Sequence, residues 1–516
     1  KNGNKLWLVS TMMVMRSRHF VVSMVVWRVT SGFVRNTKTK ATITNPSIIR
    51  TFSSSAIAAS TANFENDVPL IFLHGMKGSH LSEINENEQK KKKVWLSLQG
   101  LVNIPPKPDH HPDRDLSLPL TYCDQNKHKQ DVGNLQVDGL VNHIISLGGG
   151  SDDDDTISTM LPKIELLPFY GHVSQHLQQL QTTGQRPTRC FVYDWRRSLP
   201  ELSQEFHQFV QDEFPNRPVQ ILAHSMGGLL AFDQMRQHPS DYIGAVLVGV
   251  PFGTGIQYFQ DLHRGYYTEL GRNRQFLPAS QFTMSSHWSF FNMEESGDDT
   301  FVDITNHAGD MEFQPDVSAI GNPGTTFQET VPGDVISFDF YNVDDWERNQ
   351  VGIFDPSHKK TMHSSQLKKY KQHMKIQLSV AKEWRQETFR TGTTQCRNNM
   401  PNLVVCQTNT VPTLNQILRR KRKENASEYE QQWEYDYISG RSVPGDGRID
   451  FDKSFPPEGF DFKKVYLDSL HAKQMCWEDQ DGSLGTIMKE VDNQLEQHMV
   501  KKTATVQEEE LATSQV

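Results

Sequence analysis

Cysteine and long hydrophobic runs are scarce in this chain of 516 residues. Its five Cys include no Cys-x-x-Cys pair, so neither a disulfide scaffold nor a zinc site is expected. Hydrophobic residues make up only 36% of the chain, and its mean hydropathy is −0.59. These values exclude a protein built from many membrane-spanning helices and predict long polar insertions or tails around an ordinary core.

Acidic residues are absent from the first 64 positions, where nine basic residues lie. The rest of the chain holds 44 basic and 62 acidic residues, so the net charge of −9 becomes −18 without this stretch. A chain with so acidic a body is not expected to bind nucleic acid.

Residues 1–64 are basic and rich in Ser and Thr, which is typical of an organelle transit peptide. Residues 49–55 (Ile-Arg-Thr-Phe-Ser-Ser-Ser) resemble a mitochondrial cleavage site. We therefore expect a disordered leader and a mitochondrial destination. A secretory signal with residues 20–27 as its apolar core is an alternative, as is a plastid address; that core is too short to span a bilayer.

Apolar strand-like runs alternate with helical segments in the body of the chain, which predicts βαβ units and a mostly parallel sheet. Residues 65–500 are interpreted as one such α/β domain, with a polar tail at 501–516. The predicted core comprises residues 68–81, 160–255 and 395–500. It includes strands at 68–73, 190–196, 219–223, 244–251, 402–406 and 464–467 and a C-terminal helix near 485–499.

Two insertions separate the parts of this core. Residues 82–159 are interpreted as lid and polar insertions. Within them, Lys90 to Lys93 are expected to form a solvated loop or helix face. The four Asp at 152–155 are expected to form a linker that binds no metal ion. Residues 256–394 are aromatic-rich with weak strand periodicity and are interpreted as a cap, its aromatics forming core or an acyl-chain wall. The basic run at 419–423 is expected to be a solvated loop, with contact to anionic lipid as the alternative.

Ser225 lies in the sequence Ala-His-Ser-Met-Gly-Gly, directly after the strand at 219–223 and before a helix. This is the G-x-S-x-G nucleophile elbow with Ala in the first Gly position. Small residues are needed two positions before and after the Ser because the turn is tight. The pattern predicts that Ser225 is a nucleophile.

A nucleophilic hydroxyl needs a base, and the base needs an orienting carboxylate, in the chain order Ser, Asp, His. Asp446, in a glycine-flanked turn, is the predicted acid, with Asp450 and Asp452 as rivals. His471, immediately after the last strand and 25 residues past Asp446, is the predicted base, preferred to His224 and His498. The amides of Met226 and of Met76, in the loop after the first strand, are predicted to form the oxyanion hole.

Several of these segments together resemble the lecithin:cholesterol acyltransferase family, which includes phospholipid:diacylglycerol acyltransferases and lysosomal phospholipase A2. The resemblance rests on residues 73–81, 193–196 (Tyr-Asp-Trp-Arg), 223–228, 445–447 (Gly-Asp-Gly) and a late His, and runs with gaps over 68–475. It implies an α/β-hydrolase fold with cap and lid insertions, acting on lipid acyl esters. By motif, Ser225, Asp446 and His471 match the family's triad, and Met76 and Met226 its oxyanion positions.

Two departures accompany this resemblance. His74-Gly75 replaces the Pro-Gly of the family, and Cys123 is the only Cys before residue 190, so the family's lid disulfide is not expected. Trp195 and His74 are also predicted to contact substrate.

The expected activity is that of a serine acyltransferase or lipase without cofactor or metal, with a lipid ester as substrate, an alcohol as an acceptor and peripheral contact with a membrane. A soluble carboxylesterase or thioesterase and an inactive interaction protein on the same fold are the alternatives.

Overall fold

The computed structural model describes residues 9–14, 21–26, 67–85, 90–95, 116–120, 131–148, 163–253, 256–268, 271–291, 301–306, 327, 329–359, 362–389, 400–421 and 433–514. The chain divides into two compact units, Lys1–Arg50 and Thr51–Val516. In the first unit, β1 (Val9–Val14) and β2 (Val21–Val26) pair as an antiparallel hairpin. The cleavage-like run at 49–55, Cys123 and the four Asp at 152–155 lie outside the described residues.

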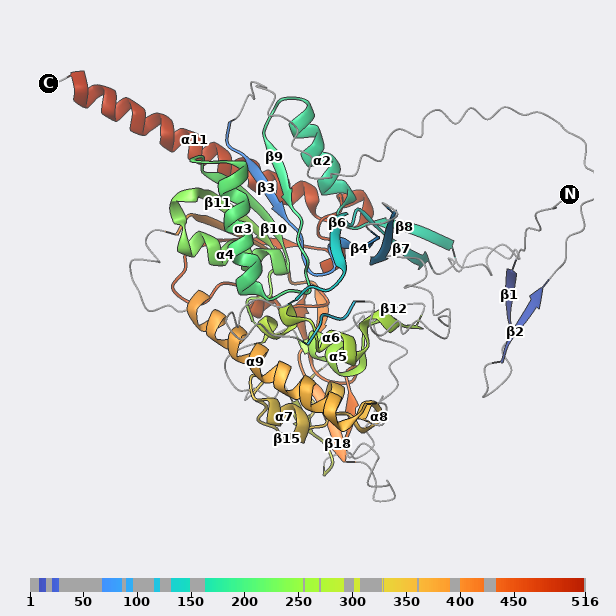
Figure 1. The fold of residues 1–516 in the computed structure, drawn as a ribbon. Helices are drawn as coiled ribbons and strands as arrows, with labels where there is room; N and C mark the ends of the chain where they lie inside the picture. The colour runs from blue at the N-terminus through green and yellow to red at the C-terminus, as the bar shows by residue number, and fades with distance from the viewer. Residues whose placement is uncertain are drawn as a thin grey trace, which may run out of the picture. The chain divides into compact units, whose positions relative to one another are not determined.

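A six-stranded parallel sheet forms the centre of the second unit (Figure 1). Its strands run parallel at every pairing. In spatial order they are β21 (Lys463–Leu467), β16 (Asn402–Thr408), β11 (Tyr242–Val248), β10 (Val219–His224), β3 (Leu70–Leu73) and β9 (Thr188–Phe191). The predicted parallel α/β class is therefore confirmed.

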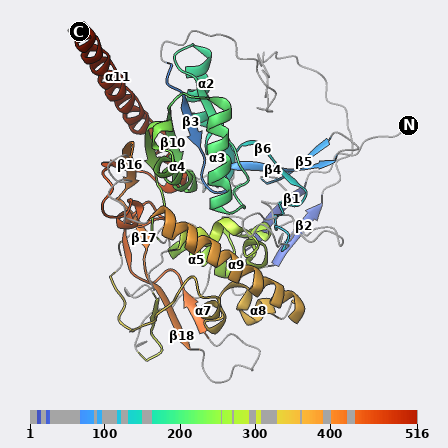
Figure 2. The ribbon, with the colours of Figure 1, turned by 60° about the vertical axis from the view of Figure 1, so that its left-hand side comes forward.

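Both faces of this sheet are covered, which explains why β3 and β10 are apolar runs without alternation. Successive strand residues belong to two different cores. One core joins the sheet to α3 (Leu199–Glu213), α4 (Met226–Gln237) and the long helix α9 (Ser364–Thr388), which Figure 2 shows beside α5. The other joins it to α2 (Gly171–Thr182) and α11 (Leu484–Ser514).

The described residues between β11 and β16 form more helix than strand, although the sequence there has weak strand periodicity. The helices include α5 (Ile256–Arg264), α6 (Pro278–Gln281), α7 (Val343–Arg348), α8 (Pro356–Lys359) and α9. Many of the aromatic side chains in this segment form one buried cluster, in which Phe259, Trp288 and Trp346 are fully buried. The aromatic side chains of this cluster therefore form a hydrophobic core, which is the first of the two interpretations given above, and not an exposed wall for acyl chains.

Three polar segments differ from expectation. Residues 90–93 belong to β5 (Lys90–Trp95), which pairs with β4 (Ser79–Asn85) and ends on the buried Val94 and Trp95. Arg419 and Arg420 lie in β18 (Ile417–Lys421), not in a loop. There they pair with acidic residues: Arg419 Nε lies 3.2 Å from Asp303 Oδ2, and Arg420 Nε 2.9 Å from Glu434 Oε2.

The third difference is at the C-terminus, where α11 continues through the expected frayed tail to Ser514. Residues 486–514 contain no Gly or Pro that would interrupt a helix. Ala, Glu, Gln and Lys in this stretch favour the helix by their intrinsic propensity, although every residue at 501–508 is exposed. None of the described helices is both long and apolar enough to cross a membrane.

Candidate active site

Ser225 lies on the sharp turn between β10 and α4. Its backbone has φ 53° and ψ −124°, a conformation that costs energy for a residue with a side chain. The Ser225 amide donates to Val248 O at 2.8 Å, which ties the turn to β11. The two glycines that follow are required sterically: a Cβ on Gly227 would lie 2.6 Å from His74 O, and one on Gly228 2.1 Å from a Val250 methyl group.

The three residues predicted for acyl chemistry come together although they lie up to 246 positions apart. His471 Nε2 lies 3.1 Å from Ser225 Oγ, and His471 Nδ1 lies 2.7 Å from Asp446 Oδ2. His471 follows β21, and Asp446 follows β20 (Ser442–Gly445). A serine nucleophile, a histidine base and an orienting carboxylate require this arrangement.

Asp446 is buried and held by several donors. Its Oδ1 accepts hydrogen bonds from the amides of Arg448 (2.9 Å) and Ile449 (2.8 Å), and Gln474 Nε2 lies 3.3 Å from its Oδ2. Burial raises the pKa of this carboxyl, but the His471 ring and the two amides outweigh burial and leave the pKa below its ordinary value. Asp446 is therefore an anion whose Oδ2 is directed at His471.

The rival residues lie elsewhere. Asp450 is buried against Asn415 and Lys453, and Asp452 is exposed. His224 adjoins Ser225, but its Nδ1 lies 2.8 Å from the Tyr170 hydroxyl and its Nε2 3.2 Å from His471 O. His498 is on α11. Of the six candidate acids and bases, Asp446 and His471 are the pair bonded to each other.

The loop after β3 brings backbone close to Ser225. A Cβ on Gly75 would lie 2.8 Å from Ser225 Cβ. The Gly75 amide donates to the Tyr170 hydroxyl at 2.8 Å, and the Gly78 amide to Gly75 O at 3.1 Å. Met76 lies between Gly75 and Gly78, whose amides both donate hydrogen bonds within the protein. Met226 is the first residue of α4, where a backbone amide has no acceptor within the helix.

Lys77 fastens the same loop to the cap, a role that no sequence signal indicated. It has φ 65°, and its carbonyl accepts a hydrogen bond from Trp95 Nε1 at 2.9 Å. Its ammonium lies 3.6 Å from the centre of the Tyr266 ring and 4.4 Å from that of Phe276. Burial lowers the pKa of Lys77 to about 8.

Trp195 and His74, predicted to contact substrate, are fully buried. Trp195 Nε1 donates to Ser79 O at 3.2 Å, and its ring stacks on Phe276. His74 stacks on Tyr193 with ring centres 4.0 Å apart, and both its nitrogens have partners, Gly75 O at 2.7 Å and the Tyr193 amide at 3.3 Å. This placement corrects the prediction: both side chains are packed in the interior and present no surface to a substrate.

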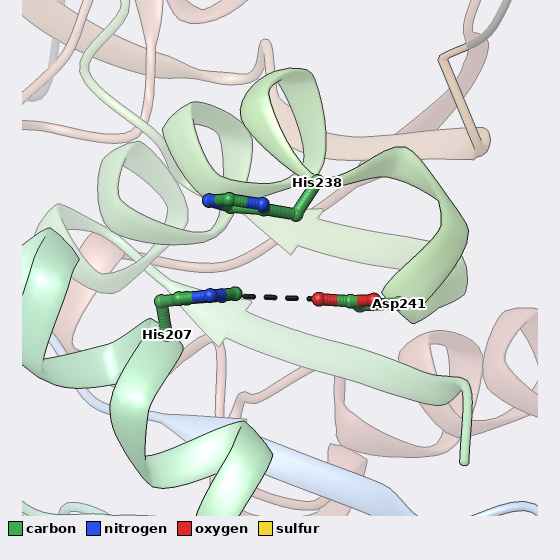
Figure 3. A group of neighbouring side chains, drawn as sticks. All are labelled: His207, His238 and Asp241. Atoms are coloured by element: carbon green, nitrogen blue, oxygen red, sulfur yellow. Dashed lines mark ion pairs between the residues drawn. The ribbon is translucent and has the colours of Figure 1, made fainter. Parts of the chain in front are cut away.

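One group of potential metal ligands lies at the end of α4 remote from Ser225 (Figure 3). It consists of His207, His238 and Asp241, and His207 Nδ1 lies 3.8 Å from Asp241 Oδ2. The two imidazoles stack with centres 3.8 Å apart and planes 13° from parallel. Since an imidazole binds a metal in the plane of its ring, at about 2.1 Å, these nitrogens do not converge on one ion, and we assign no metal here.

Two buried histidines beside the site make stability depend on pH. Burial lowers the pKa of His74 from 6.5 to about 4 and that of His224 to about 3, so both stay neutral while the unfolded chain takes up protons below pH 6.5. The free energy of unfolding should be unaffected by them above pH 6.5 and fall as the pH drops toward 4. In urea titrations between pH 6 and 5, His224→Gln should reduce this slope by about 1.4 kcal/mol per pH unit. An unchanged slope would contradict the burial of a neutral His224.

Comparison with known proteins adds partial matches. Residues 182–296, which include Ser225, match the family described as Hydrolase_4, serine aminopeptidase S33. A stretch of 94 residues is 29% identical to the monoglyceride lipase of Rattus norvegicus; it covers 18% of this chain and 29% of that relative. The match thus spans less than a third of the relative's length.

Two solved structures show a distant likeness. The crystal structure of the Tle4-Tli4 complex aligns with a TM-score of 0.47 at 11% identity, covering 80% of this chain and 96% of that one. Phospholipase PlaB from Legionella pneumophila aligns with a TM-score of 0.16 at 12% identity, covering 24% and 33%. Likenesses at this level carry no argument about activity.

The fold class itself is clear from the chain's own architecture. The parallel sheet carries a serine on a strained turn between a central strand and a helix, and the family match crosses that turn. This chain is an α/β-hydrolase by fold.

Proposed function

We propose that the chain is a serine-dependent acyl-ester hydrolase or acyltransferase acting on lipids. The observation that carries the proposal is that His471 is hydrogen-bonded to two partners, Ser225 Oγ, 3.1 Å from its Nε2, and Asp446 Oδ2, 2.7 Å from its Nδ1. A structural serine needs no histidine that is oriented in turn by a buried carboxylate, whereas a nucleophile needs both.

In the proposed first step, Ser225 Oγ attacks the acyl carbonyl while His471 Nε2 takes the hydroxyl proton. Asp446 keeps the other proton of the ring on Nδ1 and stabilises the cationic imidazolium. The tetrahedral oxyanion is held by the Met76 and Met226 amides, each lowering the barrier by about 3 kcal/mol. The imidazolium then returns its proton to the leaving alcohol, and an ester of Ser225 remains.

In the second step, water or a second alcohol gives its proton to His471 and attacks the acyl-enzyme. Its oxygen forms the new bond to the acyl carbon, and Ser225 leaves with the proton from His471. Water makes the protein a hydrolase, and a bound alcohol makes it an acyltransferase.

A lipid substrate is supported by two sequence relations. The motifs at 193–196 and 445–447 resemble those of the lecithin:cholesterol acyltransferase family, and 94 residues resemble a monoglyceride lipase. The leader at 1–64 and the mitochondrial destination remain part of the proposal.

An activity-based experiment tests the proposal. A fluorophosphonate probe should label the full chain, and peptide mass spectrometry should find the label on Ser225. The labelled and free proteins are then compared on p-nitrophenyl butyrate, a monoacylglycerol, and neutral phosphatidylcholine vesicles with and without a diacylglycerol or sterol. A lipid substrate predicts turnover of the glyceride or phospholipid, and transfer predicts a new ester of the added alcohol.

The same experiment separates the alternatives. A folded chain that does not label is an inactive hydrolase-fold protein. Labelling with turnover of soluble esters or thioesters alone identifies a carboxylesterase or thioesterase.

A further inference from the structure

A buried chain of hydrogen bonds runs behind Ser225, separate from the Ser225, His471 and Asp446 series. It begins at the Gly75 amide, which lies 2.8 Å from the Tyr170 hydroxyl oxygen. The same hydroxyl lies 2.8 Å from His224 Nδ1, and His224 Nε2 lies 3.2 Å from the carbonyl oxygen of His471. The chain thus links the loop that carries Met76 to the residue that carries the proposed base.

The directions of these hydrogen bonds are fixed by chemistry. A carbonyl oxygen can only accept, so His224 Nε2 carries the single proton of the neutral ring and donates it to His471 O. His224 Nδ1 is then an acceptor and receives the Tyr170 hydroxyl proton, while the Tyr170 oxygen accepts from the Gly75 amide. Burial, reinforced by the nearby His471, lowers the pKa of His224 to about 3 and keeps the ring neutral.

The Gly75 backbone, the Tyr170 hydroxyl, the His224 ring and Ser225 are packed closely together. A Cβ on Gly75 would lie 3.1 Å from the Tyr170 hydroxyl, 3.2 Å from His224 Nδ1 and 2.8 Å from Ser225 Cβ. Tyr170 and His224 are fully or almost fully buried, and their rings contact each other edge to face. The Gly75 backbone is therefore packed closely against Tyr170, His224 and Ser225, with no room for a side chain at this position.

We propose that Tyr170 and His224 are positioning residues that hold the oxyanion loop and the base His471 in register around Ser225. We call the chain of hydrogen bonds from Gly75 through Tyr170 and His224 to His471 the bridge. The inference rests on the proposed function, because both ends of the bridge belong to segments that have roles in the proposed reaction. Neither side chain touches Ser225 Oγ by a hydrogen bond; each acts through the backbone of a neighbouring segment. The bridge makes the oxyanion hole and the base depend on each other.

Tyr170→Phe tests this bridge because it removes one oxygen and leaves the ring. The Gly75 amide and His224 Nδ1 then lose their shared partner. With p-nitrophenyl butyrate, we expect kcat per probe-labelled site to fall about 10-fold while KM stays within about 2-fold, since the loss affects the transition state more than substrate binding. The double variant with His224→Gln should be about as slow as the slower single variant, because both break the same bridge.

Tyr435→Phe is the matched control. Tyr435 is also buried, and its hydroxyl donates to a backbone carbonyl, Asn349 O at 2.6 Å. This variant should retain the kcat of the wild type. Thermal unfolding is recorded for every variant, and rates are measured well below each transition.

The outcomes separate the inference from the proposed function. Wild-type protein that labels and turns over ester, together with a Tyr170→Phe variant of unchanged kcat, overturns the inference alone, even if that variant is less stable. Equal losses in Tyr170→Phe and Tyr435→Phe also overturn it, because the effect is then general to buried tyrosines. A folded wild type that does not label overturns the proposed function, and the positioning role with it.

Discussion

Replacing Ser225 with alanine is expected to lower kcat for ester hydrolysis by about 10⁶-fold, to the level left by the rest of the site. The reason is that His471 then has no hydroxyl to deprotonate, and no acyl-enzyme forms. Turnover of p-nitrophenyl butyrate and covalent labelling by the fluorophosphonate are measured together. Both should disappear, with the circular dichroism spectrum unchanged.

Ser240→Ala is the control for this substitution, because Ser240 is an exposed serine at the remote end of α4. It should keep wild-type turnover and labelling. Substantial residual turnover in Ser225→Ala would remove Ser225 from the mechanism.

Replacing Asp446 with asparagine is expected to lower kcat by about 10⁴-fold with little change in KM. The Asn oxygen can still accept from the Arg448 and Ile449 amides, which places its NH₂ group against His471 Nδ1. That nitrogen must then present a lone pair, so the ring proton moves to Nε2 and faces Ser225 Oγ. The histidine can no longer act as a base toward the serine. Steady-state kinetics at pH 8 measure the effect.

Asp450→Asn is the matched comparison, since Asp450 is the other buried acid of this segment. Its carboxylate pairs with Lys453 at 3.3 Å and not with a histidine, so its loss should affect stability more than kcat. A larger loss of kcat in Asp450→Asn than in Asp446→Asn would reverse the assignment of the acid.

Much of the sheet could be predicted because its strands are local apolar runs, such as β3 and β10, bounded by turn residues. Ser225 carried a strong local signal, since a tight strand-to-helix turn demands small neighbours. The pairing of Asp446 with His471 could be proposed from chain order, the glycine-flanked turn of Asp446 and the strand before His471. Its geometry, however, depends on β21 joining the sheet beside β16. Those hydrogen bonds are tertiary, and no short sequence pattern encodes them.

Other features depended on packing that is invisible in one sequence. Tyr170 precedes α2 without any motif, yet its hydroxyl reaches both Gly75 and His224. Trp195 belongs to a recognisable motif and is nevertheless buried. Lys90 to Lys93 form part of a strand because Val94 and Trp95 anchor β5, although four adjacent lysines favour a solvated loop by themselves.

The position of β21 at the edge of the sheet bears on the timing of synthesis. Ser225 leaves the ribosome long before His471, and β21 pairs only with β16, itself far along the chain. With the roles proposed above, a nascent chain that has folded around β3, β10 and β11 still lacks its base and its acid. Under the proposed mechanism, hydrolytic competence therefore arises only after His471 has been made, and translation products that end before it are expected to be inert toward esters.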